Sequence, residues 1–123
     1  MSNKILIIDD NKFLRFTLSA LLEDSGFSPF TAADPEKAIK EINSKHPDLI
    51  ILDKKLSGSD GFDLLPELKR INKDVPVILL TAYADPQTEQ QALKLGADAF
   101  VSKPFDNDDF IDVIRGLLDA AVH

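Results

Sequence analysis

Short runs of apolar residues alternate with longer amphipathic segments along this chain. Three runs, 5–8, 49–52 and 77–80, are apolar at four consecutive positions, and shorter or weaker runs cover 99–101 and 27–32. Consecutive apolar positions are typical of strands that are covered on both faces, as in a parallel sheet. We therefore predict five strands that belong to one parallel sheet.

The segments between these runs carry apolar residues at helical spacing, which predicts a helix after each strand. The helix expected from about Phe62 contains Pro66, which should kink or delay it. In three other segments the apolar positions repeat every three or four residues: Leu14, Leu18, Leu21 and Leu22; Ala38, Ile39 and Ile42; Phe110, Val113, Ile114 and Leu117.

Several helix ends can be located from single residues. Asp34-Pro35 and Asp85-Pro86 each place a capping aspartate before a proline at the first helical position. Asp106 can cap the last helix in the same way. Gly26 and Gly96 lie where helices should end.

The order of elements is strand then helix, five times over. This alternation implies a parallel sheet with right-handed crossovers. Five strands in 123 residues fit one domain, residues 1–123, with a flavodoxin-like, doubly wound (βα)5 three-layer sandwich and strand order 2-1-3-4-5. Ligands of such folds bind beyond the carboxyl ends of the strands, near the first and third strands.

Composition narrows the classes of function. Lys and Arg number 14 against 21 Asp and Glu, a formal net charge of −7, which argues against direct nucleic-acid binding and against an electrostatic membrane anchor. The chain has no cysteine, so disulfides, thiolate metal sites and a cysteine nucleophile are excluded. We find neither an apolar run of about 18 residues nor a signal peptide, and expect a cytoplasmic protein.

Polar residues with useful chemistry follow four of the predicted strands. They are Asp9-Asp10, Asp53, Thr81-Ala82 and Ser102-Lys103-Pro104. Each alone has an ordinary structural explanation, such as a helix cap, a turn or a surface lysine. Because the fold gathers these strand ends at one edge, we expect three carboxylates, a hydroxyl and an ammonium to face one another.

Such a cluster of carboxylates needs a cation. Two unit charges about 4 Å apart repel by about 4 kcal/mol at an effective dielectric of about 20, so Asp9, Asp10 and Asp53 should raise one another's pKa. An all-oxygen site favours Mg2+, and the lack of nearby Cys and His disfavours zinc. A carboxylate beside Mg2+, with a lysine and a hydroxyl opposite, suits in-line phosphoryl transfer.

At this point the residues resemble those of a known family, the receiver domains of bacterial response regulators. The resemblance extends over nearly the whole chain, and its motifs are specific in combination. The segments that carry it are 5–11 (ILIIDDN), 47–53 (PDLIILD), 58–61 (GSDG), 76–82 (PVILLTA) and 96–105 (GADAFVSKPF).

The resemblance implies a role for each acidic residue of the cluster. Asp53 would accept the phosphoryl group. Asp10 would bind Mg2+ directly, Asp9 would act mainly through water, and the backbone carbonyl of Lys55 would be a further ligand. The protein would not be an enzyme in the usual sense, since it would catalyse only its own phosphorylation and dephosphorylation.

The resemblance also implies roles at the last two strands. Thr81 would hydrogen-bond one phosphoryl oxygen, and Lys103, in a cis peptide bond with Pro104, would pair with another. Ala82 would leave room for the phosphoryl group. Phe100 would turn inward as Thr81 moves, and so would act as a switch.

The implied partners are proteins. A sensor histidine kinase or a phosphotransfer protein would supply the phosphoryl group. A downstream protein or a tethered output domain would contact helix 4, strand 5 and helix 5, around 87–94, Phe100 and 106–115. Phosphorylation-dependent dimerisation through this surface is a further option.

The chain departs from the family after the phosphoacceptor, where methionines and a proline are usual. Here the loop is Lys54-Lys55-Leu56-Ser57. Lys55 and Tyr83 occupy the positions two residues beyond Asp53 and Thr81, which border the path of the attacking water in the family. We hypothesise that both side chains shield the acyl phosphate and slow its hydrolysis.

Three alternatives remain open at this point. A flavin mononucleotide-binding protein has the same fold, but Asp9-Asp10-Asn11 would repel its phosphate. A haloacid-dehalogenase-type phosphatase would need Asp-x-Asp rather than an adjacent pair, together with a cap domain. The third alternative is a receiver fold that serves only as an interaction module, against which the complete set of site residues argues.

Overall fold

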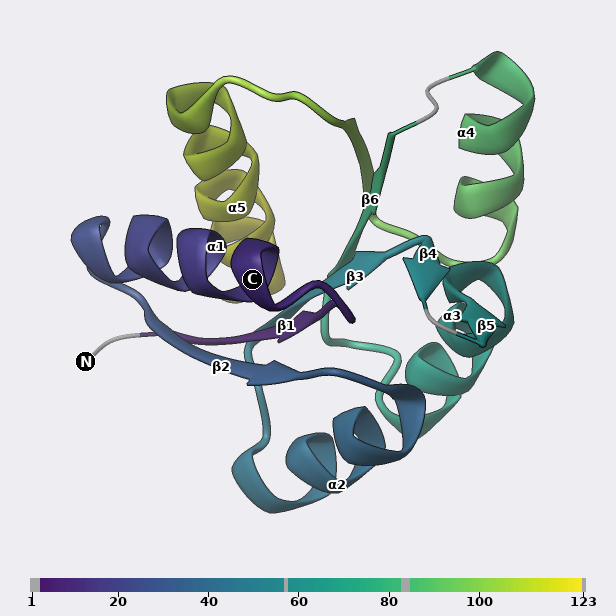
Figure 1. The fold of residues 1–123 in the computed structure, drawn as a ribbon, viewed down its shortest axis with the longest axis horizontal. Helices are drawn as coiled ribbons and strands as arrows, with labels where there is room; N and C mark the ends of the chain where they lie inside the picture. The colour runs from purple at the N-terminus through teal and green to yellow at the C-terminus, as the bar shows by residue number, and fades with distance from the viewer. Residues whose placement is uncertain (1–2, 57, 83–84, 123) are drawn as a thin grey trace.

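The computed structural model describes residues 3–56, 58–82 and 85–122. Five strands form one parallel sheet in the order β2-β1-β3-β6-β7, which confirms the predicted flavodoxin-like arrangement (Figure 1). These strands are β1 (Lys4–Ile8), β2 (Ser28–Ala32), β3 (Leu49–Asp53), β6 (Val77–Thr81) and β7 (Ala99–Ser102).

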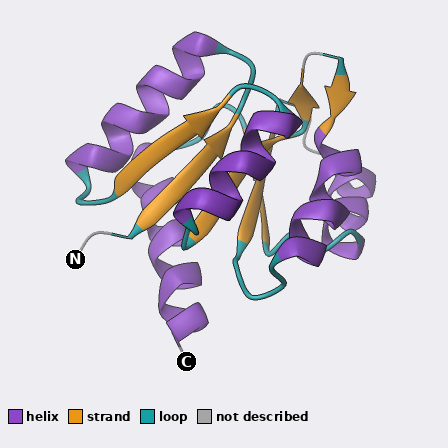
Figure 2. Ribbon diagram, turned by 90° about the horizontal axis from the view of Figure 1, so that it is seen from below, coloured by secondary structure: helices purple, strands orange, loops and turns teal. Residues whose placement is uncertain are grey.

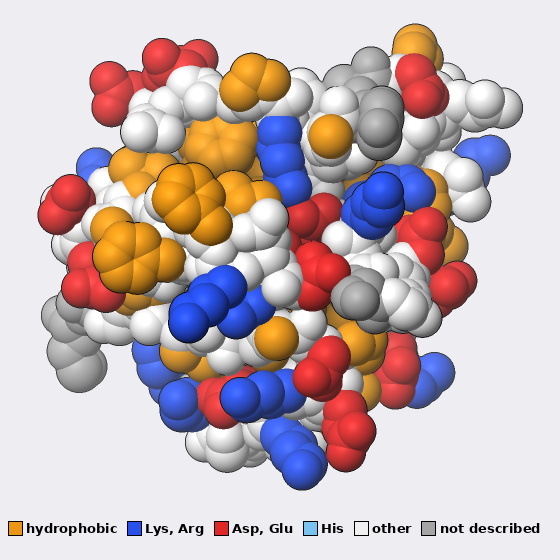
Figure 3. Space-filling view, in the orientation of Figure 1, with side chains coloured by type: hydrophobic (Ala, Val, Ile, Leu, Met, Phe, Trp, Pro, Cys, Tyr) orange, Lys and Arg blue, Asp and Glu red, His pale blue; other side chains and the backbone are white. Residues whose placement is uncertain are grey.

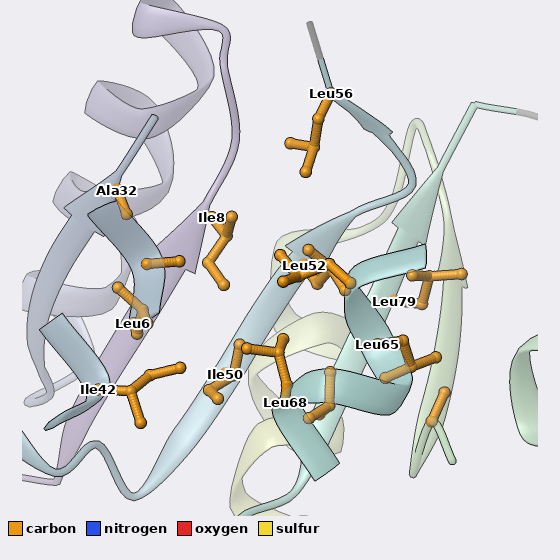
Figure 4. Packing of buried hydrophobic residues seen from close by; sticks show 14 of the residues in the cluster. Leu6, Ile8, Ala32, Ile42, Ile50, Leu52, Leu56, Leu65, Leu68 and Leu79 are labelled. Carbon is orange, nitrogen blue, oxygen red and sulfur yellow. The ribbon is translucent and has the colours of Figure 1, made fainter. Parts of the chain in front are cut away.

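Helices cover both faces of the sheet (Figure 2). They are α1 (Lys12–Asp24), α2 (Pro35–Lys45), α3 (Gly61–Ile71), α4 (Pro86–Lys94) and α5 (Asn107–Val122). Alternate residues of each central strand supply the two cores. Ile5 and Ile7 of β1 pack with α1 and α5, whereas Leu6 and Ile8 pack with α2, α3 and α4 (Figure 4).

The register of the sheet brings the carboxyl ends of the strands together. Ile8 pairs with Leu52, Asp53 pairs with Leu80, and Thr81 pairs with Ser102. The two aspartates that follow β1, the last residue of β3, the last residue of β6 and the lysine after β7 therefore share one edge of the sheet.

The predicted helix caps are present. Asp34, Asp85 and Asp106 accept hydrogen bonds from the N–H groups three residues on, at 2.8, 2.7 and 3.0 Å. Gly26 and Gly96, which follow α1 and α4, have φ of 92° and 110°. The expectation that Pro66 would delay its helix was wrong. α3 begins at Gly61 and runs through Pro66, which has an exposed side chain and removes a helical hydrogen bond because proline has no backbone N–H.

The structure adds one element that the sequence did not predict. β4 (Lys55–Leu56) and β5 (Ser59–Asp60) pair antiparallel directly after the phosphoacceptor candidate. This small hairpin stands apart from the main sheet (Figure 2). Leu56 anchors it, since its side chain is 4% exposed and belongs to the core below (Figure 4).

None of the described helices combines the length and the apolar character that crossing a membrane requires.

Candidate functional site

A cavity of about 790 Å³ opens at the carboxyl ends of β1, β3 and β6. It gathers the residues that the sequence predicted at the strand ends: Asp9, Asp10, Asp53, Thr81, Ala82 and Lys103. The hairpin and the start of α1 complete its walls. Figure 3 shows acidic and basic side chains side by side near the centre of this face.

Asp53 lies at the end of β3 and is only 6% exposed. Its two carboxylate oxygens are held by two different parts of the chain. Oδ2 lies 2.7 Å from the ammonium of Lys103, and Oδ1 accepts a hydrogen bond of 3.0 Å from the backbone N–H of Lys55. The ammonium gives the shorter, charge-assisted bond. Asp53 is therefore fixed in orientation at the cavity.

Asp9 is the most buried carboxylate of the site, at 1% exposure. Its Oδ1 accepts a hydrogen bond of 2.9 Å from the N–H of Asn11, and Arg15 donates to its backbone carbonyl at 2.8 Å. Its Oδ2 is buried without a hydrogen-bond partner. The pKa of Asp9 is raised from 3.8 to about 7, mainly by burial and in addition by the neighbouring carboxylate of Asp53, while the hydrogen bond from the Asn11 N–H acts in the opposite direction.

The orphaned oxygen of Asp9 tests whether a metal suits the site. A cation placed between Asp9 and Asp53 would give that oxygen a partner and offset the repulsion between the two carboxylates. Among the described residues, no three His, Cys, Asp or Glu side chains form a ready-made metal cage, and Asp10 is exposed. Magnesium needs few protein ligands because it retains several waters. The residues present therefore fit Mg2+.

Thr81 and Lys103 are linked through the backbone. Thr81, at the end of β6, is 3% exposed, and its carbonyl accepts a hydrogen bond of 2.7 Å from the N–H of Lys103. The peptide bond between Lys103 and Pro104 is cis. A movement of either residue would therefore displace the other.

Three further predicted residues lie in the described part of the chain: Phe100, Ala82 and Lys55. Phe100 on β7 is half-buried and packs against the core on the side of α2, α3 and α4. The side chain of Ala82 is exposed at the cavity. Lys55 is exposed as well and lines the cavity wall. Tyr83 lies outside the described residues.

Two side chains of the site were missed in the sequence. Arg15 supports the backbone at Asp9, and no sequence signal marked it. Lys54 turns away from solvent: its ammonium lies 3.2 Å from Asp60 Oδ2 and 4.7 Å from the centroid of the Phe62 ring. The Lys54-Lys55 sequence is unusual at this position, but it does not indicate where the side chain of Lys54 points.

Known proteins are similar to this chain in sequence and in fold. Residues 5–115 match the response regulator receiver domain family. Over 118 residues the chain is 36% identical to sporulation initiation phosphotransferase F of Bacillus subtilis (strain 168), a match that covers 96% of this chain and 95% of that protein. It is 33% identical to the phosphate regulon transcriptional regulatory protein PhoB of Escherichia coli (strain K12), with 96% of this chain matching 52% of that protein.

Solved structures agree with the sequence match. A CheY-like receiver domain protein from Methanospirillum hungatei JF-1 has a TM-score of 0.92 and 27% identity, covering 98% of this chain and 97% of that one. NtrX from Brucella abortus, solved with ADP, has a TM-score of 0.92 and 33% identity, but the match covers 98% of this chain and only 28% of NtrX. The chain thus spans nearly all of some relatives and about half or less of others. It belongs to the receiver domain family of two-component response regulators.

Proposed function

We propose that residues 1–123 act as one receiver domain in the cytoplasm, which takes a phosphoryl group from a phosphohistidine onto Asp53. The observation that carries this proposal is the buried Asp53 carboxylate at the cavity, with Lys103 on one oxygen and the Lys55 N–H on the other. An Asp53 oxygen attacks phosphorus and forms a P–O bond. The P–N bond of the donor breaks, and its electron pair stays on the imidazole nitrogen.

The acidic residues have a separate role in this proposal. Asp9, Asp10, Asp53 and the backbone carbonyl of Lys55 would hold Mg2+. Bound there, Mg2+ would neutralise the charge on the phosphoryl oxygens. Lys103 pairs with one phosphoryl oxygen, and the hydroxyl of Thr81 donates a hydrogen bond to another. Ala82 leaves this space open because its side chain is a single methyl group.

A protein donor is supported by the surface beside the cavity. Phe13 and Phe16 on α1 are each 73% exposed, and Leu14 between them lines the cavity. Hydrophobic side chains gather over α1 in Figure 3. Exposed apolar groups of this kind are typical of protein contact sites. A histidine kinase or a phosphotransfer protein could thus bind next to Asp53.

Phosphorylation would be read out at the other side of the site. It adds a charge of about −1.5 to −2 at Asp53, so Lys103 would leave the carboxylate for the phosphoryl oxygens. Because the Lys103 N–H is bonded to the Thr81 carbonyl, the ends of β6 and β7 would move together and take Phe100 with them. The surface of α4, β7 and α5 would then bind a downstream protein, a tethered output domain or a second copy.

Labelling with a small acyl phosphate tests the proposal directly. Acetyl phosphate and Mg2+ should add one phosphoryl group to the wild-type protein, seen in its intact mass, and none to Asp53→Asn. Asp24→Asn, an exposed aspartate at the end of α1, serves as the matched control and should label normally. Labelling of Asp53→Asn at the wild-type level would contradict the proposal, and steady turnover of a small phosphate ester would favour a phosphatase.

A further inference from the structure

The side chain of Lys54, directly after the phosphoacceptor, is held by two groups of the following segment. Its ammonium lies 3.2 Å from Asp60 Oδ2 and 4.7 Å from the centroid of the Phe62 ring. The lysine side chain is only 28% exposed. An ion pair combined with a cation–π contact orders a lysine more than an exposed ion pair alone.

Asp60 joins Lys54 to the start of α3. Its Oδ1 accepts a hydrogen bond of 2.8 Å from the N–H of Phe62 and so caps the helix, while its Oδ2 receives Lys54. Asp60 is also the last residue of the hairpin, opposite Lys55. The Lys54 side chain therefore connects the residue before the hairpin with the residue that ends it.

The backbone of Lys54 is fixed as well. Its N–H donates to the Leu80 carbonyl of β6 at 2.8 Å, and its carbonyl accepts from the Gly61 N–H at 2.5 Å. The backbone of Lys54 is thus hydrogen-bonded both to the central sheet and to Gly61, the residue that follows the hairpin. Leu56 packs this hairpin against the core, and the contact between Lys54 and Asp60 holds its base together.

The hairpin begins at Lys55, whose backbone N–H and carbonyl both matter for the site. The Lys55 N–H donates to Asp53 Oδ1 at 3.0 Å, and the Lys55 carbonyl is the backbone ligand in the proposed Mg2+ site. A small displacement of β4 would move both groups relative to Asp53. The positions of the Lys55 N–H and carbonyl therefore depend on what holds the hairpin closed.

We propose that Lys54 is a positioning residue, whose ammonium, held by Asp60 and Phe62, keeps the hairpin closed so that the Lys55 backbone faces Asp53 and the metal. Lys54 acts through the hairpin and does not itself contact the phosphoryl group. This inference rests on the proposed function, since it concerns the same Mg2+ site.

Titration with Mg2+ alone, followed by calorimetry, is the primary test. Lys54→Ala should weaken Mg2+ binding by about tenfold, the low end of the loss expected when a group that orients metal ligands is removed. Lys54→Arg should restore most of the affinity, because it keeps the charge and the contact with the ring. Asp60→Asn keeps a capping oxygen for α3 and removes the ion pair, so it should weaken binding in the same direction.

The chain offers a close control in Lys45. This lysine also pairs with a carboxylate, Glu41, at 3.0 Å, and lies 5.0 Å from the centroid of the Phe30 ring, but it is on α2, outside the cavity. Lys45→Ala should bind Mg2+ as tightly as the wild type. A general effect of losing a lysine with such contacts would appear in both variants.

Amide hydrogen exchange without metal gives a readout that is independent of binding. The Lys55 amide should exchange several-fold faster in Lys54→Ala than in the wild type, whereas the amides of β1 should be unchanged. Should Lys54→Ala fail to fold, Lys54→Met and Asp60→Asn decide the matter by the same two measurements. Lys54→Met tests the charge alone, because its side chain can still pack on Phe62.

The outcomes separate the two proposals. A wild-type protein that binds Mg2+, together with Lys54→Ala or Lys54→Met that bind equally well and keep a slowly exchanging Lys55 amide, would overturn the role of Lys54 and leave the proposed function intact. A wild-type protein that binds no Mg2+ and takes no phosphoryl group would overturn both.

Discussion

The ammonium of Lys103 lies 2.7 Å from Asp53 Oδ2, although the two residues are 50 positions apart in the chain. The side chains are 22% and 8% exposed, so the pair is largely withdrawn from solvent. The same carboxylate lies beside the buried Asp9. Lys103 therefore offsets part of the repulsion that the fold creates between two acidic side chains.

Replacing Lys103 should destabilise the protein in the absence of metal. Lys103→Met leaves the buried Asp53 oxygen without its cationic partner, and we expect the free energy of unfolding to fall by about 1 to 3 kcal/mol. Urea denaturation at neutral pH measures this change. The loss should be smaller in an Asp53→Asn background, and Lys40→Met, at an exposed position of α2, should change little. An equal loss in both backgrounds would mean that the pair is not its cause.

Any side chain at Gly61 should disturb the phosphoacceptor. A Cβ atom there would lie 2.6 Å from the Asp53 carbonyl oxygen and 2.8 Å from the Cα of Lys54, and both are backbone atoms that cannot rotate away. We expect Gly61→Ala to lower the free energy of unfolding by about 1 to 3 kcal/mol and to slow labelling by acetyl phosphate.

Gly116 in α5 provides the opposite control. A Cβ atom at this position meets nothing within 4 Å, so Gly116→Ala should stabilise the helix by about 0.5 to 1 kcal/mol. Thermal denaturation of the two variants should therefore shift in opposite directions. Shifts of the same sign would contradict the packing of α3 on Asp53.

The cap of α4 should give a pH-dependent contribution to stability. Hydrogen bonds from the N–H and the hydroxyl of Thr88, at 2.7 and 3.0 Å, hold the pKa of Asp85 below its usual value of 3.8. A lowered pKa means that the charged form stabilises the folded state above the unfolded pKa, and that this contribution is lost as the pH falls through the folded pKa.

Asp85→Asn keeps an acceptor but loses the charge. The difference in melting temperature between this variant and the wild type should be constant at about pH 5 to 7 and should shrink on acidification below the usual aspartate pKa. Thermal scans across that range measure it. A difference that persists unchanged at the lowest pH at which both proteins fold would show that the charge is irrelevant.

The phosphoryl group should be long-lived. Lys55 lines the cavity with an exposed side chain, a position from which it can cover the route of the attacking water. Lys55→Ala and Tyr83→Ala should each shorten the lifetime of the labelled protein several-fold, measured by loss of the added mass after the donor is removed. A lifetime of seconds in the wild type that neither substitution changes would reject this hypothesis.

The fold could be predicted because its signals are local. Runs such as 5–8 and 49–52 are apolar at every position, and this pattern in so short a segment is typical of a strand covered on both faces. The caps of α2 and α4 act over three residues. The alternation of strands and helices indicated a parallel sheet, and five strands in one small domain fitted the flavodoxin-like strand order. The edge that collects Asp53 and Lys103 was therefore predictable too.

The details of the site depend on contacts that no local pattern encodes. Strands of two residues, as in the hairpin, have no periodicity to detect. The side chain of Lys54 could have pointed to solvent, as that of Lys55 does. Its contacts with Asp60 and Phe62 depend on how the hairpin folds back toward α3. The two carboxylate oxygens of Asp9 differ in the same way. One accepts a hydrogen bond from Asn11, only two residues away, whereas the burial of the other without a partner results from packing in three dimensions.

The place of β7 at the edge of the sheet affects which part of the protein can respond most easily. This strand has one neighbour, β6, and its four residues are only half-buried, whereas β3 is buried throughout. Strands held by a single ladder open locally at a lower free energy than central ones. Lys103 follows β7 directly, so a change of charge at Asp53 would act on an edge strand, which rearranges at a lower cost than a central one, while the central strand that carries Asp53 would keep its place.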